Sequence, residues 1–298
     1  MAVQGNILTA FAAGALGASG ILVSLLRNPT WSRRILGHRN QIEEVSTLHP
    51  DYKPGDKQPS PFTSDKYLAL NPAELGDAMY PFMISAVVPR PVAFVSSLSK
   101  NGAGNLSPYS YFNAMSHDPP MVVIGHSYSS AKKDTGGKKD TLANILETGE
   151  FVVNIMNEWY VEAANFTCGP YDRGINEMTL SGLTPMESVK VKPPRVKESA
   201  VHFECKLVHS YEIKNHTGKA TGMIVVGEVL LAHMHEEVAT KSPHSGHDVV
   251  DLKKYSPVSR LGGVSYGRTT EYYNIPRPPK EEQKTPKTAS EADEKARL

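Results

Sequence analysis

The feature that most constrains the fold is a series of short apolar segments, rich in β-branched and aromatic residues, between residues 62 and 276. Each segment has the length and composition of a β-strand, and proline or other turn residues separate them. The Asn101-Gly102 pair predicts a tight hairpin between the first two, because both residues tolerate positive φ. The segments are PVAFVSSLS, LSPYSYFNAM, MVVIGHS, FVVNIM, VHFECKLVHSYEI and MIVVGEVLLAHM.

Only two segments have the pattern of a helix. The first covers residues 141–148, with Asp140 or Thr141 as its N-cap, and the second covers roughly residues 158–166. Strands joined mainly by turns favour an antiparallel barrel over a doubly wound parallel sheet. The sequence contains neither GxGxxG nor GxxxxGK[ST], so the dinucleotide-binding and P-loop alternatives lose their main support.

The N-terminal segment, residues 1–26, contains an uncharged apolar run at residues 7–26 that is long enough to cross a bilayer as a helix. Glycine, serine and threonine dilute the run, so two interpretations stay open: a membrane anchor and an Ala/Gly helix packed on the protein itself. Arginines follow the run and none precedes it, which favours a downstream domain that faces the cytoplasm or a matrix. A cleaved secretory signal and a mitochondrial presequence fit this arrangement less well.

The other divisions of the chain follow from composition. Residues 27–61 are basic and then proline-rich, which predicts a linker. Residues 277–298 are half charged, which predicts a disordered, solvated tail. Residues 62–276 therefore form the domain expected to carry the function.

The charge and cysteine content excludes several classes of function. Lysine and arginine total 32 against 31 aspartates and glutamates, so the net charge of +1 does not favour nucleic acid as a partner. Cys168 and Cys205 form no CxxC pair, which excludes a disulfide scaffold and a thiolate zinc site and suggests two buried hydrophobic residues. Four histidines followed by an aspartate match no tight metal template, so no metal site is expected; they are His233, His235, His244, His247 and Asp248.

A phosphate site is suggested by the tetrapeptide KKDT, which occurs at residues 132–135 and again at 138–141. Only the second copy begins a helix, where backbone N–H groups and the helix dipole favour an anion. Lys139 and the Thr141 hydroxyl lie at this helix start. The alternative is that these lysines belong to an ordinary solvated loop.

A second candidate site is the segment from Asn105 to Asn113, where hydroxyls and amides stand among aromatic rings. Strand alternation divides its side chains between two faces until a bulge or turn resets the pattern. An ordinary half-buried strand is one interpretation, and a ledge for a flat heteroaromatic ligand is the other. One face would carry Ser107, Tyr109, Tyr111 and Asn113, and the other Pro108, Ser110 and Phe112.

Nine short motifs in chain order span almost all of residues 62–276, and together they resemble the flavin reductase-like, FMN-binding split-barrel family. Each motif alone is modest, but nine in the same order are hard to obtain by chance. They are PRPVAFVSS (89–97), NLSPYSYFN (105–113), DPP (118–120), KDTLANI (139–145), EFVVNI (150–155), GLTP (182–185), KPPRV (192–196), ECKL (204–207) and RLGG (260–263).

This resemblance implies a mainly β fold: a six-stranded antiparallel Greek-key split barrel with a few flanking helices, which forms a homodimer and binds FMN near the dimer interface. It implies that Lys139 and Thr141 hold the phosphate and that Arg90 is a second cation for the phosphate or the flavin O2 edge. The segment 260–266 would reach the cofactor or the partner subunit. The flavin ring and ribityl chain would be lined by Ser107, Ser110, Tyr111, Phe112 and Asn113.

The resemblance further implies an FMN-dependent oxidoreductase that moves electrons from NAD(P)H to flavin, or from flavin to an unidentified acceptor. No catalytic side chain is expected, because the cofactor carries the electronic chemistry. The alternative is a non-catalytic FMN-binding or storage module tethered at a membrane. The KKDTGG insertion would either add Lys132 and Lys133 to the phosphate site or shift the start of the helix.

Overall fold

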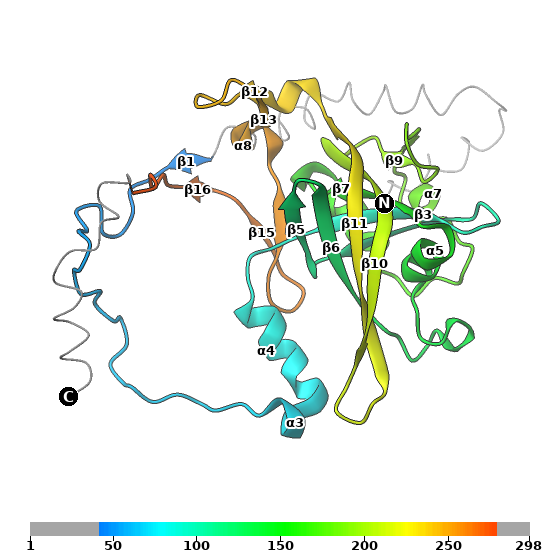
Figure 1. Ribbon diagram of the computed structural model, residues 1–298, viewed down its shortest axis with the longest axis horizontal. Coiled ribbons are helices and arrows are strands. Elements are labelled where there is room, and N and C mark those ends of the chain that lie inside the picture. Colours follow the sequence, from blue (N-terminus) through cyan, green and yellow to red (C-terminus); the bar gives the residue numbers. More distant parts are fainter. Residues whose placement is uncertain (1–41, 279–298) are drawn as a thin grey trace, which may run out of the picture. The chain divides into compact units, whose positions relative to one another are not determined.

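The computed structural model describes residues 42–278 (Figure 1). Within them the chain forms two units, one of residues 68–269 and a smaller one of residues 42–67 and 270–278. In the described residues no helix is both long and apolar enough to span a bilayer. The apolar run at residues 7–26, predicted above as a possible anchor, lies outside the described residues.

The smaller unit is held by a short parallel ladder. Strand β1 (Glu43–Glu44) pairs with β16 (Glu271–Tyr272), and the Glu43 amide donates to the Thr270 carbonyl at 2.9 Å.

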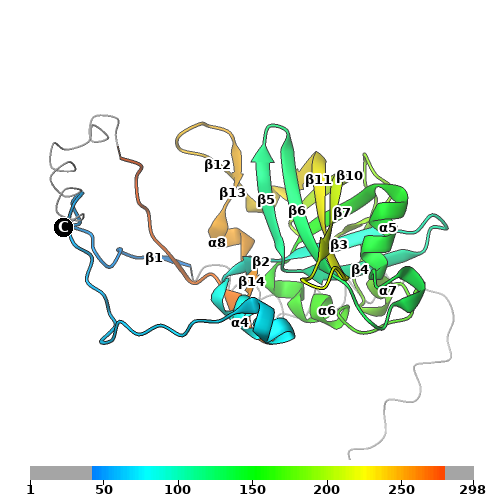
Figure 2. The same cartoon turned by 60° about the horizontal axis from the view of Figure 1, so that its bottom comes forward.

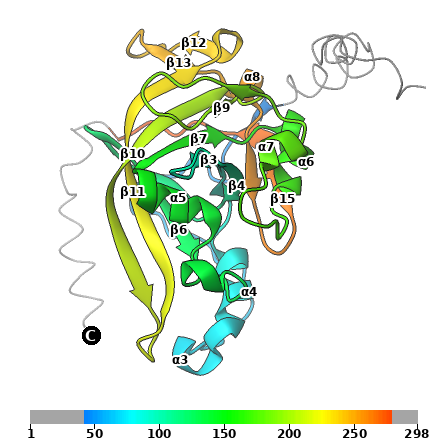
Figure 3. The same cartoon turned by 90° about the vertical axis from the view of Figure 1, so that its right-hand side faces the viewer.

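The larger unit is built on one antiparallel sheet with the strand order β4-β3-β7-β10-β11-β6-β5. Figures 1 and 3 show that this sheet is strongly curved, so that one of its faces lies on the inside. The strands are β3 (Ala93–Leu98), β4 (Gly104–Tyr109), β5 (Phe112–His117), β6 (Pro120–Ser127), β7 (Glu150–Ile155), β10 (Val201–Lys214) and β11 (Ala220–Met234).

The two edge strands of this sheet, β4 and β5, are consecutive in the chain and are joined only by Ser110 and Tyr111. A flat sheet of this width would separate its edges by about 29 Å, whereas three Cα–Cα steps reach about 11 Å. The sheet must therefore roll up until its edges meet. The prediction of a mainly β, antiparallel split barrel is confirmed.

The sheet has seven strands where six were expected. The difference arises because the segment LSPYSYFNAM, predicted as one strand, bends at Ser110-Tyr111 and supplies both β4 and β5. The predicted hairpin at Asn101-Gly102 is confirmed between β3 and β4. There Gly102 has φ +80°, and the Ser99 amide donates to the Ala103 carbonyl at 2.9 Å.

The remaining strands are short. β2 (Arg90–Pro91), β14 (Val258–Arg260) and β15 (Tyr266–Arg268) form a three-stranded sheet in the order β15-β14-β2. Two further pairs join β8 (Pro185–Met186) to β9 (Arg195–Val196) and β12 (Ala239–Lys241) to β13 (Asp248–Val250).

Both predicted helices are confirmed. The first is α5 (Asp140–Thr148), whose N-cap residue is Lys139 rather than Asp140 or Thr141, and Figure 3 shows it against β3 and β4. The second consists of the 3-10 turn η3 (Glu158–Tyr160) and α6 (Val161–Phe166).

Several helices were not predicted, because they are short or lack an amphipathic pattern. Helix α4 (Met79–Ala86) carries Pro81 in its first turn, where proline is tolerated, and has no charged residue. Figure 2 shows α4 along the outside of β2 and β14. The others are α3 (Pro72–Leu75), η1 (Gly76–Ala78), η2 (Lys133–Thr135), α7 (Glu177–Leu180), η4 (Glu236–Val238) and α8 (Leu252–Tyr255).

Both faces of strand β3 are buried, so the core has two parts. Ala93 and Val95 contribute to a cluster inside the barrel, whereas Phe94 and the preceding Val92, just before the strand, pack in a second cluster with Met156. Apolar side chains therefore cover β3 on both sides and make it a rigid support for the strands beside it.

The two cysteines differ in their surroundings. Cys205 is fully buried in the barrel core, as predicted, but Cys168 is exposed and lines a cavity. The prediction that Cys168 is a buried hydrophobic residue is therefore wrong, because it lies in a surface loop after α6.

Candidate functional site

Two adjoining cavities lie where β4 ends and α5 begins. The larger has a volume of about 510 Å³ and the smaller about 190 Å³. Ser107, Tyr109 and Lys139 line both of them, so the cavities meet at these three residues. The barrel closure therefore places the sheet edge, the Ser110-Tyr111 bend and the helix start around one hollow.

The smaller cavity contains the bend that closes the barrel. Ser110 and Tyr111 both line it, and the Gly125 amide of β6 donates to the Tyr111 carbonyl at 2.7 Å. A Cβ on Gly125 would lie 3.0 Å from Tyr111 Cβ, which is tighter than most Cβ contacts, so glycine favours this close approach. The bend also resets the strand alternation: Tyr109 is buried, but Tyr111 is 41% exposed.

Arg90 lies in the wall of the smaller cavity and is only 6% exposed. Its Nη1 donates to the carbonyls of Ile84 at 2.6 Å and Val87 at 2.5 Å, and its Nη2 donates to that of Leu261 at 2.9 Å. Its Nε donates to Ser110 Oγ at 3.3 Å. The guanidinium thus joins the end of α4 and the segment after β14 to the bend.

Lys139 lines both cavities and is exposed, so it places a positive charge where they meet. Its backbone is extended at the N-cap position, and α5 begins with the next residue. The first-turn amides of a helix have no acceptor within the helix. The charge of Lys139 and these amides therefore favour an anion at this point.

Thr141 lines the larger cavity, although its side chain is only 1% exposed. Asn105 Nδ2 donates to its hydroxyl oxygen at 3.0 Å. Burial raises the pKa of the neighbouring Tyr109 to about 12, against the opposing influence of the Thr141 and Ser107 hydroxyls. The Tyr109 hydroxyl consequently stays protonated and can donate.

His126 lies behind Tyr109, with ring centroids 4.5 Å apart. It is 2% exposed, and neither ring nitrogen has a hydrogen-bond partner among the described residues. Burial, and secondly the charge of Lys139, lower the pKa of His126 to about 3. The imidazole is therefore neutral at physiological pH.

Two predicted site residues do not line either cavity. Phe112 packs against the barrel core, and Asn113 is exposed, with its Oδ1 accepting from the Ala114 amide at 2.8 Å. The structure thus gathers Arg90, Ser107, Ser110, Tyr111, Lys139 and Thr141 around the two cavities and leaves Phe112 and Asn113 apart from them.

Other residues around the cavities were not assigned to the site beforehand. Asn105, Asp140 and Glu177 line the larger cavity, as does the loop of residues 167–173. Only their position in space identifies Glu177 and the loop, because both lie far along the chain from β4, whereas Asn105 and Asp140 adjoin predicted segments in the sequence. Arg260, from the segment expected to reach the cofactor or the partner subunit, lines the smaller cavity.

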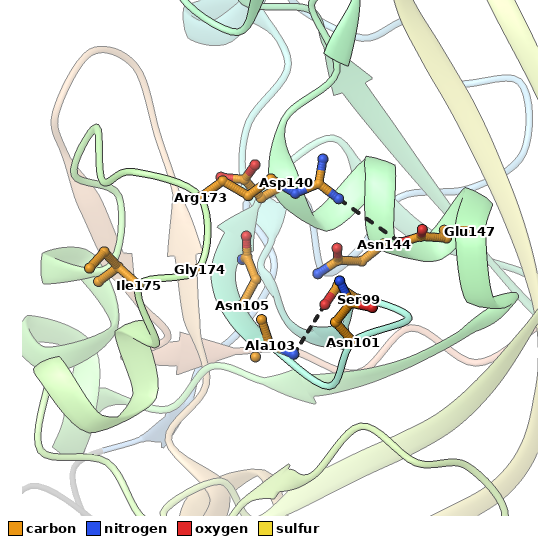
Figure 4. Close-up of a pocket in the computed structure, with 11 residues that line it drawn as sticks. Ser99, Asn101, Ala103, Asn105, Asp140, Asn144, Glu147, Arg173, Gly174 and Ile175 are labelled. Carbon is orange, nitrogen blue, oxygen red and sulfur yellow. Dashed lines mark hydrogen bonds and ion pairs between the residues drawn. The ribbon is translucent and has the colours of Figure 1, made fainter. Parts of the chain in front are cut away.

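A third cavity of about 230 Å³ lies on the other side of Asn105 and Asp140 (Figure 4). Figure 4 shows Asn144 and Glu147 of α5 facing the turn between β3 and β4. Arg173 Nη2 lies 3.9 Å from Glu147 Oε2. Because Asn105, Asp140 and Arg173 also line the larger cavity, the three cavities form a row past the start of α5.

Residues 42–278 contain no group of three or more histidine, cysteine or acidic side chains that could hold a metal ion. His233 Nε2 instead lies 2.6 Å from Oε1 of the buried Glu204. His235 Nδ1 accepts from the Glu237 amide at 3.2 Å.

The groups around the cavities suit a phosphorylated flavin. Lys139 and the first turn of α5 favour a phosphate, the Tyr111 ring provides an apolar surface, and the Ser107 and Ser110 hydroxyls can bond polar ring-edge atoms. Asp140 Oδ1 is buried without a hydrogen-bond partner among the described residues, so it can accept from a ligand hydroxyl.

The chain has relatives among known proteins. The chain is 37% identical over 199 residues to the uncharacterised protein YwrF of Bacillus subtilis. The alignment covers 67% of this chain and 93% of YwrF. Nitrilotriacetate monooxygenase component B from Bacillus cereus superposes with a TM-score of 0.65 at 32% identity, covering 71% of this chain and 100% of that one.

A second solved structure, 2-nitrobenzoate 2-nitroreductase NbaA of Pseudomonas fluorescens, superposes with a TM-score of 0.58 at 29% identity, covering 72% of this chain and 96% of that one. The family model described as the flavin reductase like domain matches residues 84–249, which include β4, the bend and α5. The chain therefore belongs to the flavin reductase-like family, whose members are flavin-related oxidoreductases.

Proposed function

We propose that this protein is an FMN-binding oxidoreductase of the flavin reductase type, which moves electrons from NAD(P)H to flavin or from flavin to a further acceptor. The observation that carries the proposal is the meeting of the two cavities at Ser107, Tyr109 and Lys139. There a helix start that favours an anion lies beside an aromatic bend that carries hydroxyls, in a family of flavin proteins.

The chain's own residues would bind and orient the cofactor. Lys139 would neutralise the phosphate, with Thr141 and the first-turn amides of α5 beside it. Ser107, Ser110 and Tyr111 would contact the ring and ribityl chain, and Phe112 and Asn113 continue this stretch at the start of β5. Arg90, which lines the smaller cavity, holds Ser110 in place and is proposed as a second cation near the ring.

When bound, the flavin would supply the electron-transfer chemistry. The protein would provide the walls: the Tyr111 ring, the neutral His126 behind Tyr109, and hydroxyls that keep their protons at physiological pH. This arrangement requires no protein side chain that exchanges a proton or forms a covalent bond.

We further propose that the functional form is a homodimer. Helix α4 buries only Ile84, while Tyr80, Phe82 and Met83 are 61%, 46% and 46% exposed. An exposed apolar surface of this kind is typical of an interface. Because Tyr80 also lines the smaller cavity, a second subunit packed on α4 would lie at the flavin site.

The proposal is tested with the full chain, freed of flavin and then mixed with FMN under anaerobic conditions. The absorbance spectrum is recorded before and after adding NADH, and separately NADPH. A bound-flavin spectrum that bleaches with either nucleotide supports the reductase function and identifies the donor. Bound FMN that stays oxidised with both nucleotides overturns the reductase part and leaves an FMN-binding module. Absence of FMN binding overturns the site assignment.

A further inference from the structure

The first KKDT copy, which the proposed function does not use, forms a compact loop of residues 129–138 before α5. The Ser129 amide donates to the Gly137 carbonyl, and the Gly137 amide donates to the Lys132 carbonyl, both at 2.7 Å. Gly136 and Gly137 have φ of +65° and +91°, which a residue with a side chain adopts only with strain. The loop is therefore folded back on itself beside the helix start.

This folding turns Lys132 toward the larger cavity. Its Nζ donates to Asp140 Oδ2 at 2.7 Å and to the Tyr171 carbonyl at 3.1 Å, and Lys132 lines that cavity. The side chains of Lys132 and Asp140 are only 22% and 13% exposed, so solvent screens this ion pair incompletely. The next lysine, Lys133, is exposed and does not line the cavity.

Asp140 is an unexpected residue at a phosphate site. It is the first residue of α5, directly after Lys139, and its carboxylate borders the cavity. Three further acidic residues line the same cavity: Glu177, which is 6% exposed, and the exposed Asp134 and Asp172. Negative charge on this cavity would repel a phosphate unless cations compensate it.

We propose that Lys132 is a positioning residue: its ammonium offsets the charge of Asp140 and so allows the start of α5 to select a phosphorylated flavin over an unphosphorylated one. The inference rests on the proposed function, because it assigns the specificity of the same site. Lys132 acts through Asp140 and through the Tyr171 carbonyl, and it joins the inserted loop, the helix start and the loop of residues 167–173.

The test compares the affinities of the full chain for FMN and for riboflavin, measured by flavin fluorescence. For Lys132→Gln we expect FMN binding to weaken about tenfold, while riboflavin binding stays within about twofold of wild type. Lys133→Gln, a neighbour of equal charge, should leave both affinities unchanged. Lys132→Arg keeps the charge and should keep the preference for FMN, which separates charge from a general loss of loop structure.

A double substitution separates action through Asp140 from direct contact with the phosphate. Lys132→Gln combined with Asp140→Asn removes both charges, and we expect it to restore FMN affinity to within about threefold of wild type. A double variant that binds FMN as weakly as Lys132→Gln overturns the inference, because Lys132 would then contact the phosphate itself.

The remaining outcomes are also distinguishable. If Lys132→Gln loses affinity for FMN and for riboflavin equally, the inference is overturned. It is also overturned if Lys132→Gln keeps the wild-type preference for FMN. In both cases, binding of FMN by the wild-type protein still supports the proposed function. A wild-type protein that binds neither flavin overturns the proposed function and this inference with it.

Discussion

Asn105 in β4 donates through Nδ2 to the Thr141 hydroxyl oxygen at 3.0 Å, and both residues are buried. This contact joins the edge of the barrel to the first turn of α5, 36 residues later in the chain. Since Asn105 and Thr141 both line the larger cavity, the same hydrogen bond stabilises the fold and sets the shape of the site.

Thr141→Val should lower the free energy of unfolding by about 1–3 kcal/mol, because it leaves the buried Asn105 amide without its acceptor. Urea denaturation of Thr141→Val, Asn105→Ala and the double variant measures the coupling, which we expect to be about 1 kcal/mol. A coupling near zero would show that the two side chains act independently.

Lys139→Ala should weaken FMN binding by roughly 10- to 100-fold, because the phosphate loses a charge-assisted contact at the helix start. Flavin fluorescence titration measures the affinity. Lys138→Ala is the matched control, since Lys138 Nζ lies over the Tyr128 ring at 5.5 Å and the side chain lines neither cavity. Equal effects of the two substitutions would contradict the assignment of Lys139.

Arg90→Ala should destabilise the protein by about 2–4 kcal/mol, because it removes the donors to three backbone carbonyls around the smaller cavity. Urea denaturation measures this change. Arg195→Ala is the control: this guanidinium donates to the single, exposed carbonyl of Glu187, and its loss should cost less than about 1 kcal/mol. A similar cost for both arginines would rule out a structural role particular to Arg90.

Stability should fall as the pH is lowered from 6.5 toward 3, in part because of His126. Its pKa is about 3 in the folded protein against 6.5 for an unperturbed histidine, so over this range the unfolded state binds a proton that the folded state does not. Through His126, the free energy of unfolding is about 2 kcal/mol lower at pH 5 than at pH 8.

His126→Leu should therefore lose less stability between pH 8 and pH 5 than the wild type, as measured by urea denaturation at both values. Some pH dependence should remain, because the pKa of His202 is also lowered to about 3, chiefly by burial. The exposed His117 provides the control His117→Leu, which should keep the wild-type pH dependence. If the free energy of unfolding of His126→Leu falls between pH 8 and pH 5 by as much as that of the wild type, this assignment is refuted.

Sequence patterns were sufficient for features that depend on neighbouring residues. Strand composition and turn residues predicted the antiparallel barrel, the Asn101-Gly102 hairpin and α5, because backbone preferences act over a few residues. The KKDT repeat likewise indicated a helix start that borders the cavities, because a helix start and its flanking lysine lie together in the chain. The short helices were missed because tertiary packing, rather than periodicity, stabilises them.

What only the tertiary structure decided is which distant groups meet. Alternation placed Tyr109 and Tyr111 on one face, but closure of the barrel bends the chain between them and turns one inward and the other outward. Tertiary packing also brings the loop of residues 167–173 to the cavity beside β4, and the folded loop of residues 129–138 sets Lys132 against Asp140. Local sequence does not encode the opposite orientations of these two tyrosines, because they arise only when two sheet edges, far apart in a flat sheet, are joined by two residues.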